Sequence, residues 1–183
     1  MSSFTESKFQ MVTAPEERWY VFDLETNGLY DDVVEIFCLV IYDIQRKQTL
    51  TYGPDSIADG LEHLAKANVL IGHNIIFYDI PVIRKLYPFY TFRSAPVIDT
   101  LVCTRLIWPK EILYDLDLSV YPEVPAKLKG SASLKAWGYR LADNKIEFKD
   151  FSAYSEEMAE YCRQDVNVTY KLLCFIQSQN YPE

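Results

Sequence analysis

Apolar residues in the first third of the chain follow the pattern of three consecutive strands. The segment from Arg18 to Thr26 is apolar at its centre, and residues 35 to 44 form a nearly continuous apolar run, as in a strand buried on both faces. Residues 47 to 52 alternate polar and apolar side chains. Because only a short polar turn separates the second and third runs, we expect the three strands to form a meander.

From residue 56 onward the period changes, and the pattern predicts helices that alternate with short strands. Ser56 is placed to cap a helix over residues 57 to 68, which carries its apolar residues on one face. The remaining predicted elements are a strand at 69 to 71, a helix from about Asp79 with Pro81 in its first turn, a strand and helix joined by a cap at Asp99 or Thr100, a helix from the cap Ser131 to Leu141, and a long helix from Glu156 to about Gln177 capped by Ser155.

The order of these elements predicts an α/β fold with a mixed sheet, because strands come first and then mix with helices. Residues 109 to 130, which contain two further prolines, are predicted to be irregular. A length of 183 residues, 49% of them hydrophobic, suits one domain with a sizeable core. We therefore assign residues 1–17 to a partly flexible N-terminal extension and 18–183 to the domain.

Composition bears on the cellular compartment of the protein. No apolar run reaches the roughly 18 residues that span a membrane, and the first residues lack the apolar segment of a signal peptide. The four cysteines lie far apart without metal or redox spacing, which predicts reduced core thiols. We expect a cytoplasmic protein, in a host cytoplasm if it is phage-encoded, with no membrane partner.

The net charge of −8 argues at first against a polyanionic partner. The charge is unevenly distributed, however, since residues 84–149 hold 11 Lys and Arg against 7 Asp and Glu. Part of the remaining acidity is consistent with a metal site whose ions would cancel it, and the basic middle third could then contact phosphates. A solvated surface of mixed charge explains the same numbers.

Two carboxylates, Asp23 and Glu25, stand where the first predicted strand ends. Acidic residues are depleted in strands and costly to bury unless they are paired or bind a metal. Strand periodicity points both side chains to one face and Leu24 to the other. Two such carboxylates repel each other unless a cation lies between them, and all-oxygen ligation suits Mg²⁺ or Mn²⁺.

Two further acids occupy unusual positions. Asp79 follows a buried strand and a turn, and Asp165 lies in the last helix four residues after Tyr161, so that both share one helical face. Each feature alone has an ordinary structural explanation: a turn for the first pair, a helix cap for Asp79, and a structural hydrogen bond for Tyr161 and Asp165. Their order along the chain, strand end, turn after a second strand and late helix, makes chance agreement of all three improbable.

This ordered set resembles the tyrosine-type DEDD family of 3′→5′ exonucleases. The segment DLET resembles its first motif, HNIIFYD its second and YCRQD its third. The stretches IDTLVCTRLIW and KLKGSASLKAWGYRL are similar to the proofreading exonuclease domain of phage-type family A DNA polymerases. The resemblance spans roughly Trp19 to Gln177 and implies a ribonuclease H-like mixed sheet flanked by helices.

The resemblance implies a catalytic centre in which two Mg²⁺ or Mn²⁺ ions help to hydrolyse the terminal phosphodiester. It carries the catalytic roles to five residues, of which all but Tyr161 would be metal ligands: Asp23, Glu25, Asp79, Tyr161 and Asp165. The residues expected to contact the substrate are Leu24 and Thr26 near the terminal 3′ hydroxyl, Asn74 of the second motif, Phe77, Tyr78 or Leu29 stacked on the last bases, and Lys127, Lys129 and Arg140 along the backbone. A place in the core is equally plausible for Phe77 and Tyr78. His73 is explained as well by a structural role as by a phosphate contact, and the basic residues are explained by a solvated face.

The expected function is release of 5′-mononucleotides from single-stranded or frayed DNA 3′ ends. Two alternatives stay open: an RNA-trimming 3′→5′ exonuclease, because nothing in the sequence would exclude a 2′-hydroxyl, and a nucleic-acid-binding module of the same fold without catalysis. Four residues separate Asn74 from Asp79, as in the phage type, and Ala132 stands where phage polymerases usually carry a histidine. The sequence ends at Glu183, just after the last predicted helix, and no polymerase domain follows. A free-standing enzyme, a proofreading subunit beside a separate polymerase, and a polymerase fragment are all compatible with it.

Overall fold

A five-stranded mixed sheet forms the centre of the computed structural model, which describes residues 16–90, 95–143 and 148–179. The strands lie in the order β3-β2-β1-β4-β5. Neighbours are antiparallel from β1 to β3 and parallel from β1 through β4 to β5. The strands are β1 (Trp19–Thr26), β2 (Ile36–Asp43), β3 (Gln48–Tyr52), β4 (Val69–Gly72) and β5 (Val97–Asp99). The predicted meander and the mixed α/β sheet are confirmed.

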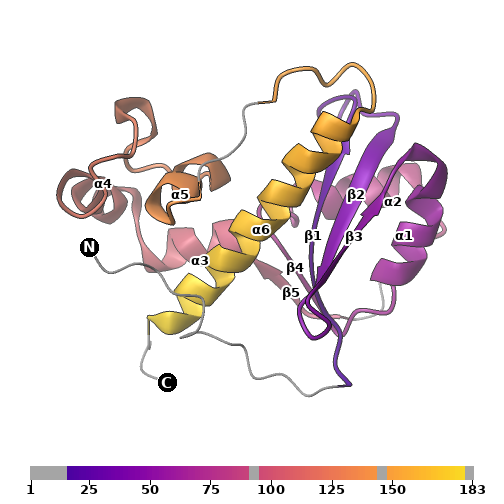
Figure 1. Cartoon of the computed structure of the whole chain (residues 1–183), viewed down its shortest axis with the longest axis horizontal. Helices are drawn as coiled ribbons and strands as arrows, with labels where there is room; N and C mark the ends of the chain where they lie inside the picture. The colour runs from indigo at the N-terminus through magenta and orange to yellow at the C-terminus, as the bar shows by residue number, and fades with distance from the viewer. Residues whose placement is uncertain (1–15, 91–94, 144–147, 180–183) are drawn as a thin grey trace.

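Helices cover both faces of this sheet (Figure 1). The helices α1 and α2 lie on one face, and the long α6 crosses the other, with α3, α4 and α5 gathered beside its C-terminal half. The helices are α1 (Ile57–Leu64), α2 (Asp79–Leu86), α3 (Thr100–Ile107), α4 (Lys110–Ser119), α5 (Leu134–Arg140) and α6 (Glu156–Ser178), and two short 3-10 turns are η2 (Pro54–Ser56) and η3 (Ala126–Leu128). None of the helices in these ranges is long and apolar enough to cross a membrane.

The alternation of β1 decides which side chains face which helices. Tyr20, Phe22 and Leu24 belong to the buried cluster that includes α1 and α2, whereas Val21 belongs to the cluster that includes α6. Since side chains of one strand alternate between faces, residues of odd number in β1 point toward α6. The two carboxylates of β1 are therefore presented to the helix that carries the third motif. A third cluster, centred on the fully buried Trp137, joins α4 and α5 to α6.

Several predicted boundaries are wrong, and the reasons are local. The helix after Ser56 ends at Leu64 rather than at residue 68, and the Ser56 hydroxyl donates to the Gly53 carbonyl instead of capping. The cap of α5 is Ser133, whose side chain accepts from the Ala136 N–H. Ser155, by contrast, caps α6 as predicted, accepting from the Met158 N–H.

The segment 109–130 is not irregular, because it contains α4 and η3. Only Leu113 and Asp117 are buried in α4, so the helix shows no continuous apolar stripe in the sequence. Pro109 precedes its first turn, where a missing N–H costs little. Of the predicted N-terminal extension, residues 1–15 lie outside the described ranges.

Candidate active site

The C-terminal end of β1 places Asp23 and Glu25 on the sheet face that α6 covers. Their partners in the antiparallel pairing with β2 are Val40 and Cys38, and the register shifts directly after Glu25. Both acids are partly buried, which is unusual for carboxylates at the centre of a sheet. The shift in register ends the regular pairing at this point and leaves the two side chains at the edge of the core.

Cys162 of α6 meets these carboxylates from the helix side. Its Sγ lies 3.5 Å from Asp23 Oδ2 and 3.5 Å from the Asp23 carbonyl oxygen. Ligand atoms of Asp23, Glu25 and Cys162 all lie within 4.8 Å of one another, a spacing at which one cation could contact all three. Burial, together with Cys38 and the charge of Asp23, raises the pKa of the Cys162 thiol well above its ordinary value, so the thiol acts as a hydrogen-bond donor to Asp23.

The cysteines were predicted from the sequence to be core thiols, and the structure confirms the burial of Cys162, but its contact with the carboxylates was missed. The only indication of this contact in the sequence was the position of Cys162, directly after Tyr161 and three residues before Asp165. Residues three apart on a helix are neighbours, with Cβ atoms about 5–6 Å apart. Cys162 therefore connects Asp165 to Asp23 in space.

Asp79 begins α2 and is the most buried of the proposed metal ligands, with an exposed fraction of 3%. Burial raises the pKa of its carboxyl to about 7, Asp99 adds to the rise, and backbone hydrogen bonds from Asp79 itself and from Leu24 oppose it. The bond from Leu24 places this carboxyl beside β1, between the positions of Asp23 and Glu25. Within the described residues, Asp79 Oδ1 is buried and accepts no hydrogen bond. A cation at this point would compensate for the lost solvation, so the donor set fits a hard metal ion.

Tyr161 and Asp165 lie one turn apart on α6, as their spacing predicted. Asp165 is buried, with 6% exposed, and Tyr161 is partly exposed. The Tyr161 ring packs against Phe148, with ring centres 5.8 Å apart, and meets the edge of Phe151 at 6.1 Å. These contacts restrict the plane of the ring. Neither Asp79 nor Asp165 belongs to the 4.8 Å cluster of Asp23 and Glu25 in the described part of the chain, so the four acids share a neighbourhood without all touching.

Of the expected substrate contacts next to β1, some side chains are hydrogen-bonded within the protein and others are exposed. The Tyr78 hydroxyl donates to the Gly28 carbonyl, its oxygen accepts from the Thr26 hydroxyl, and its ring packs on the core. Thr26, whose hydroxyl oxygen also lies 3.0 Å from that carbonyl oxygen, is 7% exposed. Phe77 and Leu29, by contrast, are 69% and 78% exposed. Tyr78 thus has the core position that the sequence allowed for it, whereas Phe77 and Leu29 are available to stack on bases.

Asp99 holds the second motif in place, a role that the sequence indicated only as a helix cap. Its carboxylate accepts from Leu101 and Val102 at the start of α3, and also from the Asn74 N–H at 2.9 Å and the Ile76 N–H at 3.0 Å. Asn74 has a φ of +70°, the left-handed conformation that asparagine tolerates better than most residues. The turn that leads to Asp79 is therefore anchored to α3. His73 contacts the Thr100 hydroxyl at 2.9 Å, which favours its structural role.

The position of Arg140 contradicts its expected contact with the substrate. Its guanidinium forms a two-point ion pair with Asp117, at 2.8 Å on each side, and both side chains are almost completely buried. The guanidinium also lies 4.7 Å from the centre of the Trp137 ring. A side chain enclosed in this way cannot reach a nucleic-acid backbone, so the assignment of Arg140 to the substrate was wrong. Lys127 is exposed, and Lys129 is partly buried with its Nζ 3.3 Å from the Asp117 carbonyl.

Comparison with known proteins agrees with this geometry. The sequence profile of the RNase_H superfamily matches residues 20–176. The chain is 34% identical over 180 residues to the DNA-directed DNA polymerase of Escherichia phage T7 and 33% identical to that of Enterobacteria phage T3. Each alignment covers 84% of this chain but 26% of the relative, so the chain spans about a quarter of the length of these polymerases.

Solved structures support the fold. Brucella melitensis NrnC bound to pGG superposes with a TM-score of 0.60 at 18% identity, covering 90% of this chain and 74% of NrnC. The zinc-bound complex of E. coli ExoI with single-stranded DNA gives 0.58 at 15% identity, covering 90% of this chain and 41% of ExoI. Similarity at this level of identity concerns the fold alone, and it confirms the predicted ribonuclease H-like sheet flanked by helices.

Proposed function

The chain belongs to the RNase_H superfamily, and on this premise we propose that it is a metal-dependent 3′→5′ exonuclease. The proposed reaction releases 5′-mononucleotides from single-stranded or frayed DNA 3′ ends. The observation that carries the proposal is the convergence of Asp23 and Glu25 with α6 at the end of β1, next to the buried Asp79 carboxyl. Buried carboxylates in one neighbourhood, one of them with an oxygen that lacks a hydrogen bond, are arranged for cations rather than for stability.

The residues that would hold two Mg²⁺ or Mn²⁺ ions are Asp23, Glu25, Asp79 and Asp165. When bound, such ions supply Lewis-acid stabilisation of the charge that develops on the attacking and leaving oxygens. Cys162 is the positioning residue of this set, because its thiol donates to Asp23 Oδ2 and so restricts that carboxylate. The protein's own contribution is thus to gather the carboxylates around one phosphate.

Tyr161 is proposed to orient the attacking water through its hydroxyl. Free tyrosine has a pKa near 10 and is a poor base at neutral pH, so its value lies in positioning. The contacts of its ring with Phe148 and Phe151 limit its rotation, which an orienting group requires.

The terminal nucleotides are proposed to lie between β1 and the second motif. The Leu24 backbone and Thr26 would face the 3′ end, Asn74 would line the turn, and the exposed Phe77 and Leu29 would stack on the last bases. Stacking of this kind tolerates any sequence, as a general exonuclease needs. Tyr78 would act by holding Phe77 and Thr26 in place, since its hydroxyl is bonded to Thr26.

The proposal also covers the kind of nucleic acid that is cut and the protein partner. DNA is favoured over RNA by the similarity to phage DNA polymerases, whereas the NrnC structure was obtained with pGG, so an RNA-trimming activity is the second candidate. A separate polymerase subunit is the proposed protein partner in proofreading, because the relatives that the chain resembles are DNA polymerases.

Digestion of labelled oligonucleotides tests the proposal directly. Single-stranded DNA, blunt duplex DNA and single-stranded RNA, each with a 5′ label, are incubated with the protein in Mg²⁺, Mn²⁺ or EDTA. We expect a ladder that shortens from the 3′ end on DNA, with both metals and not in EDTA. Hydrolysis that continues after thorough chelation would contradict the mechanism, and faster cleavage of RNA would favour the second candidate.

A further inference from the structure

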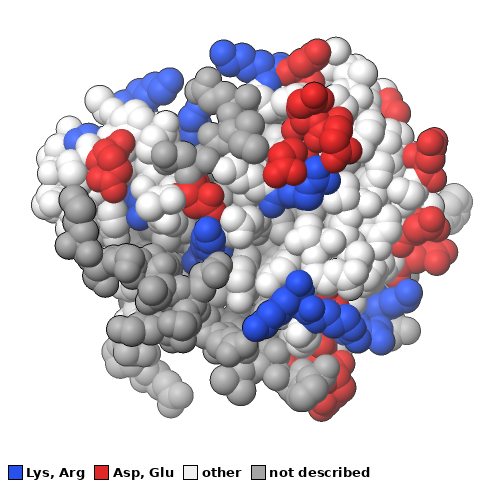
Figure 2. Space-filling model, in the orientation of Figure 1, with Lys and Arg blue, Asp and Glu red and all other residues white. Residues whose placement is uncertain are grey.

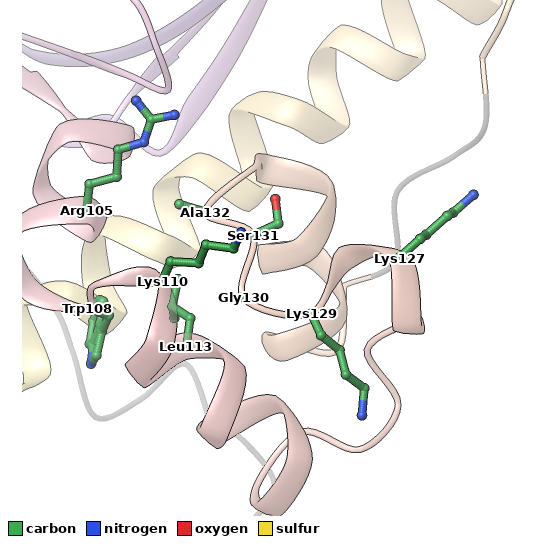
Figure 3. Close-up of a pocket in the computed structure, with 9 residues that line it drawn as sticks. All are labelled: Arg105, Trp108, Lys110, Leu113, Lys127, Lys129, Gly130, Ser131 and Ala132. Carbon is green, nitrogen blue, oxygen red and sulfur yellow. The ribbon is translucent and has the colours of Figure 1, made fainter.

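A basic cavity lies between α3, α4 and the turn before α5, away from the cluster of carboxylates (Figure 3). It has a volume of about 420 Å³, and four of its nine lining residues are Lys or Arg while none is acidic. In a protein with a net charge of −8, a cavity whose charged lining residues are all cations departs from the average surface. On the face seen in Figure 2, small groups of basic and acidic side chains alternate, and neither sign covers a continuous surface.

The cations of this cavity differ in how they are held. Lys110 runs along the cavity toward Ser131, and Arg105 projects from α3 on the side opposite to Lys127 and Lys129, which extend outward (Figure 3). Within residues 16–90, 95–143 and 148–179, neither Arg105 nor Lys110 forms an ion pair or a side-chain hydrogen bond. Two unpaired cations on one concave surface repel each other, and an anion between them would relieve that repulsion.

The walls of the cavity are rigid. Trp108 stacks on Phe175 with ring centres 5.5 Å apart and tilts against Trp137 at 5.3 Å, so its ring is part of the core. Gly130 has a φ of +73°, and a Cβ there would lie 3.0 Å from the Lys110 carbonyl oxygen, so only glycine lets this turn approach α4 so closely. These packed walls hold the backbone of the turn and of the helix ends around the cavity, while the Arg105 and Lys110 side chains are exposed and accessible to a phosphate.

The position of the cavity relates it to the proposed active site. Asp99 joins the second motif to the start of α3, and Arg105 and Trp108 lie near the end of the same helix. An α-helix of eight residues spans about 12 Å, which a stacked strand at 3.4 Å per nucleotide covers with roughly three to four nucleotides and a more extended strand with fewer.

We propose that this cavity binds a backbone phosphate of the substrate strand, with Arg105 and Lys110 as its ligands, upstream of the nucleotide that is removed. The inference rests on the proposed function and adds to it a substrate class: single strands longer than about four nucleotides, rather than dinucleotides. The cavity would raise affinity for a long strand without touching the reacting phosphodiester.

The test compares two double variants of equal charge. Arg105→Gln with Lys110→Gln removes the proposed ligands, and Lys47→Gln with Lys66→Gln removes two exposed cations, one in the turn between β2 and β3 and one after α1, so each variant has a net charge of −10. Binding of a fluorescent ten-nucleotide single strand is followed by anisotropy in EDTA at several salt concentrations. Hydrolysis of that strand and of a dinucleotide is measured in Mg²⁺.

We expect the first variant to reduce the slope of log affinity against log salt by about 0.7, because the cavity would hold one phosphate and each phosphate contact on a single strand contributes about 0.7. Its kcat/KM on the ten-nucleotide strand should fall about 10- to 100-fold, mainly through KM, while that on the dinucleotide stays unchanged. The second variant should leave the slope unchanged, and the single variant Lys110→Arg should keep the wild-type slope. Thermal unfolding checks that the first variant remains folded.

A slope that is the same in both double variants would overturn the inference, as would an equal loss on the dinucleotide. If wild-type protein degrades neither substrate, the proposed exonuclease function fails, while the binding slopes still decide whether the cavity holds a strand. The two hypotheses can thus fail separately.

Discussion

At the scale of single residues, the candidate site is defined by carboxylates whose surroundings do not favour their charge. Asp79 and Asp165 are nearly excluded from solvent, and Asp23 and Glu25 are partly buried beneath α6. Such an arrangement costs free energy of folding, and the proposed binding of cations would account for its presence. Substitutions at these positions should therefore separate catalysis, metal binding and stability.

Tyr161→Phe and Asp165→Ala distinguish the two proposed roles on α6. Tyr161→Phe keeps the ring contacts with Phe148 and Phe151 and loses only the hydroxyl, so kcat should fall about 10²–10⁴-fold with Mn²⁺ affinity unchanged. Asp165→Ala should lose at least as much activity and also bind Mn²⁺ more weakly, as should Asp23→Ala. The measurements are kcat and calorimetric Mn²⁺ titration, and full activity of Tyr161→Phe would remove the tyrosine from the mechanism.

Asp79→Asn should stabilise the metal-free protein. The substitution keeps the shape of the side chain and removes a buried carboxylate, so the free energy of unfolding in EDTA at pH 8 should rise by roughly 1–2 kcal/mol. Mn²⁺ should stabilise the wild type and have little effect on the variant. Urea unfolding with and without Mn²⁺ measures both quantities, with exposed Asp115→Asn as the matched control. Equal stabilisation of wild type and Asp79→Asn by Mn²⁺ would exclude Asp79 as a ligand.

At the scale of secondary-structure elements, buried polar contacts decide how helices are attached. Asp99 joins β5, the start of α3 and the turn of the second motif, and the Asp117–Arg140 pair joins α4 to α5. His63 of α1 lies between the hydroxyls of Tyr52 in β3, at 2.8 Å, and Tyr20 in β1, at 3.0 Å. Each contact links segments that are distant in the sequence.

Asp117→Asn should cost about 3–5 kcal/mol of unfolding free energy, because it leaves the buried Arg140 guanidinium without its counter-charge. Asp117 also accepts from the Gly130 N–H at 2.8 Å, so the turn beside the basic cavity should loosen as well. The double variant Asp117→Leu with Arg140→Met should recover part of the loss, since it removes both charges together. Urea denaturation of the three proteins checks this, and a double variant less stable than Asp117→Asn would show that the pair is net stabilising.

The attachment of α1 should weaken in acid through His63. Burial lowers the pKa of His63 below its ordinary value of 6.5, so the neutral ring is favoured in the folded state. As pH falls below 6.5, the unfolded chain takes up the proton first, and stability that is fully present above pH 6.5 is lost. The neighbouring charges oppose one another, Asp43 raising the pKa while Lys66, Arg18 and Arg46 lower it. Thermal unfolding between pH 7.5 and 5 should show a smaller drop for His63→Gln than for the wild type, and parallel curves would contradict this assignment.

At the scale of the whole molecule, the carboxylate cluster and the basic cavity lie beside different parts of α6. The carboxylates lie where β1 ends beneath α6, and the basic cavity lies in the group of helices beside the C-terminal half of α6 (Figure 1). A strand that contacts both must be unpaired along the intervening distance. Under the proposed function we therefore expect a preference for single-stranded ends.

Single-stranded 3′ ends should be cut faster than blunt duplex ends, with mismatched ends in between. Opening about three base pairs costs roughly 4 kcal/mol, which would slow a duplex by up to about 10³-fold. Initial rates on three oligonucleotides that share one 3′ sequence measure the order. Equal rates on all three would show that the protein opens duplexes itself or cuts internally, and neither behaviour is consistent with a strand threaded past the carboxylates.

The sequence determined the features that depend on local order. The apolar runs of β1 and β2, the placement of Asp23 and Glu25 on one face, and the Ser155 cap of α6 follow from periodicity and capping, which are properties of neighbouring residues. The resemblance to a family of exonucleases followed from the order of the motifs, and the superfamily match confirmed it.

Only the tertiary structure decided which polar side chains are enclosed and by what. Arg140 resembled a phosphate ligand in the sequence, but a partner 23 residues away encloses it, and Cys162 looked like a core thiol until α6 placed it 3.5 Å from a carboxylate 139 residues earlier. Helix α4 escaped detection because it buries little, so no apolar stripe marks it. Burial and pairing arise between elements brought together by folding, and the pattern along a single segment does not contain them.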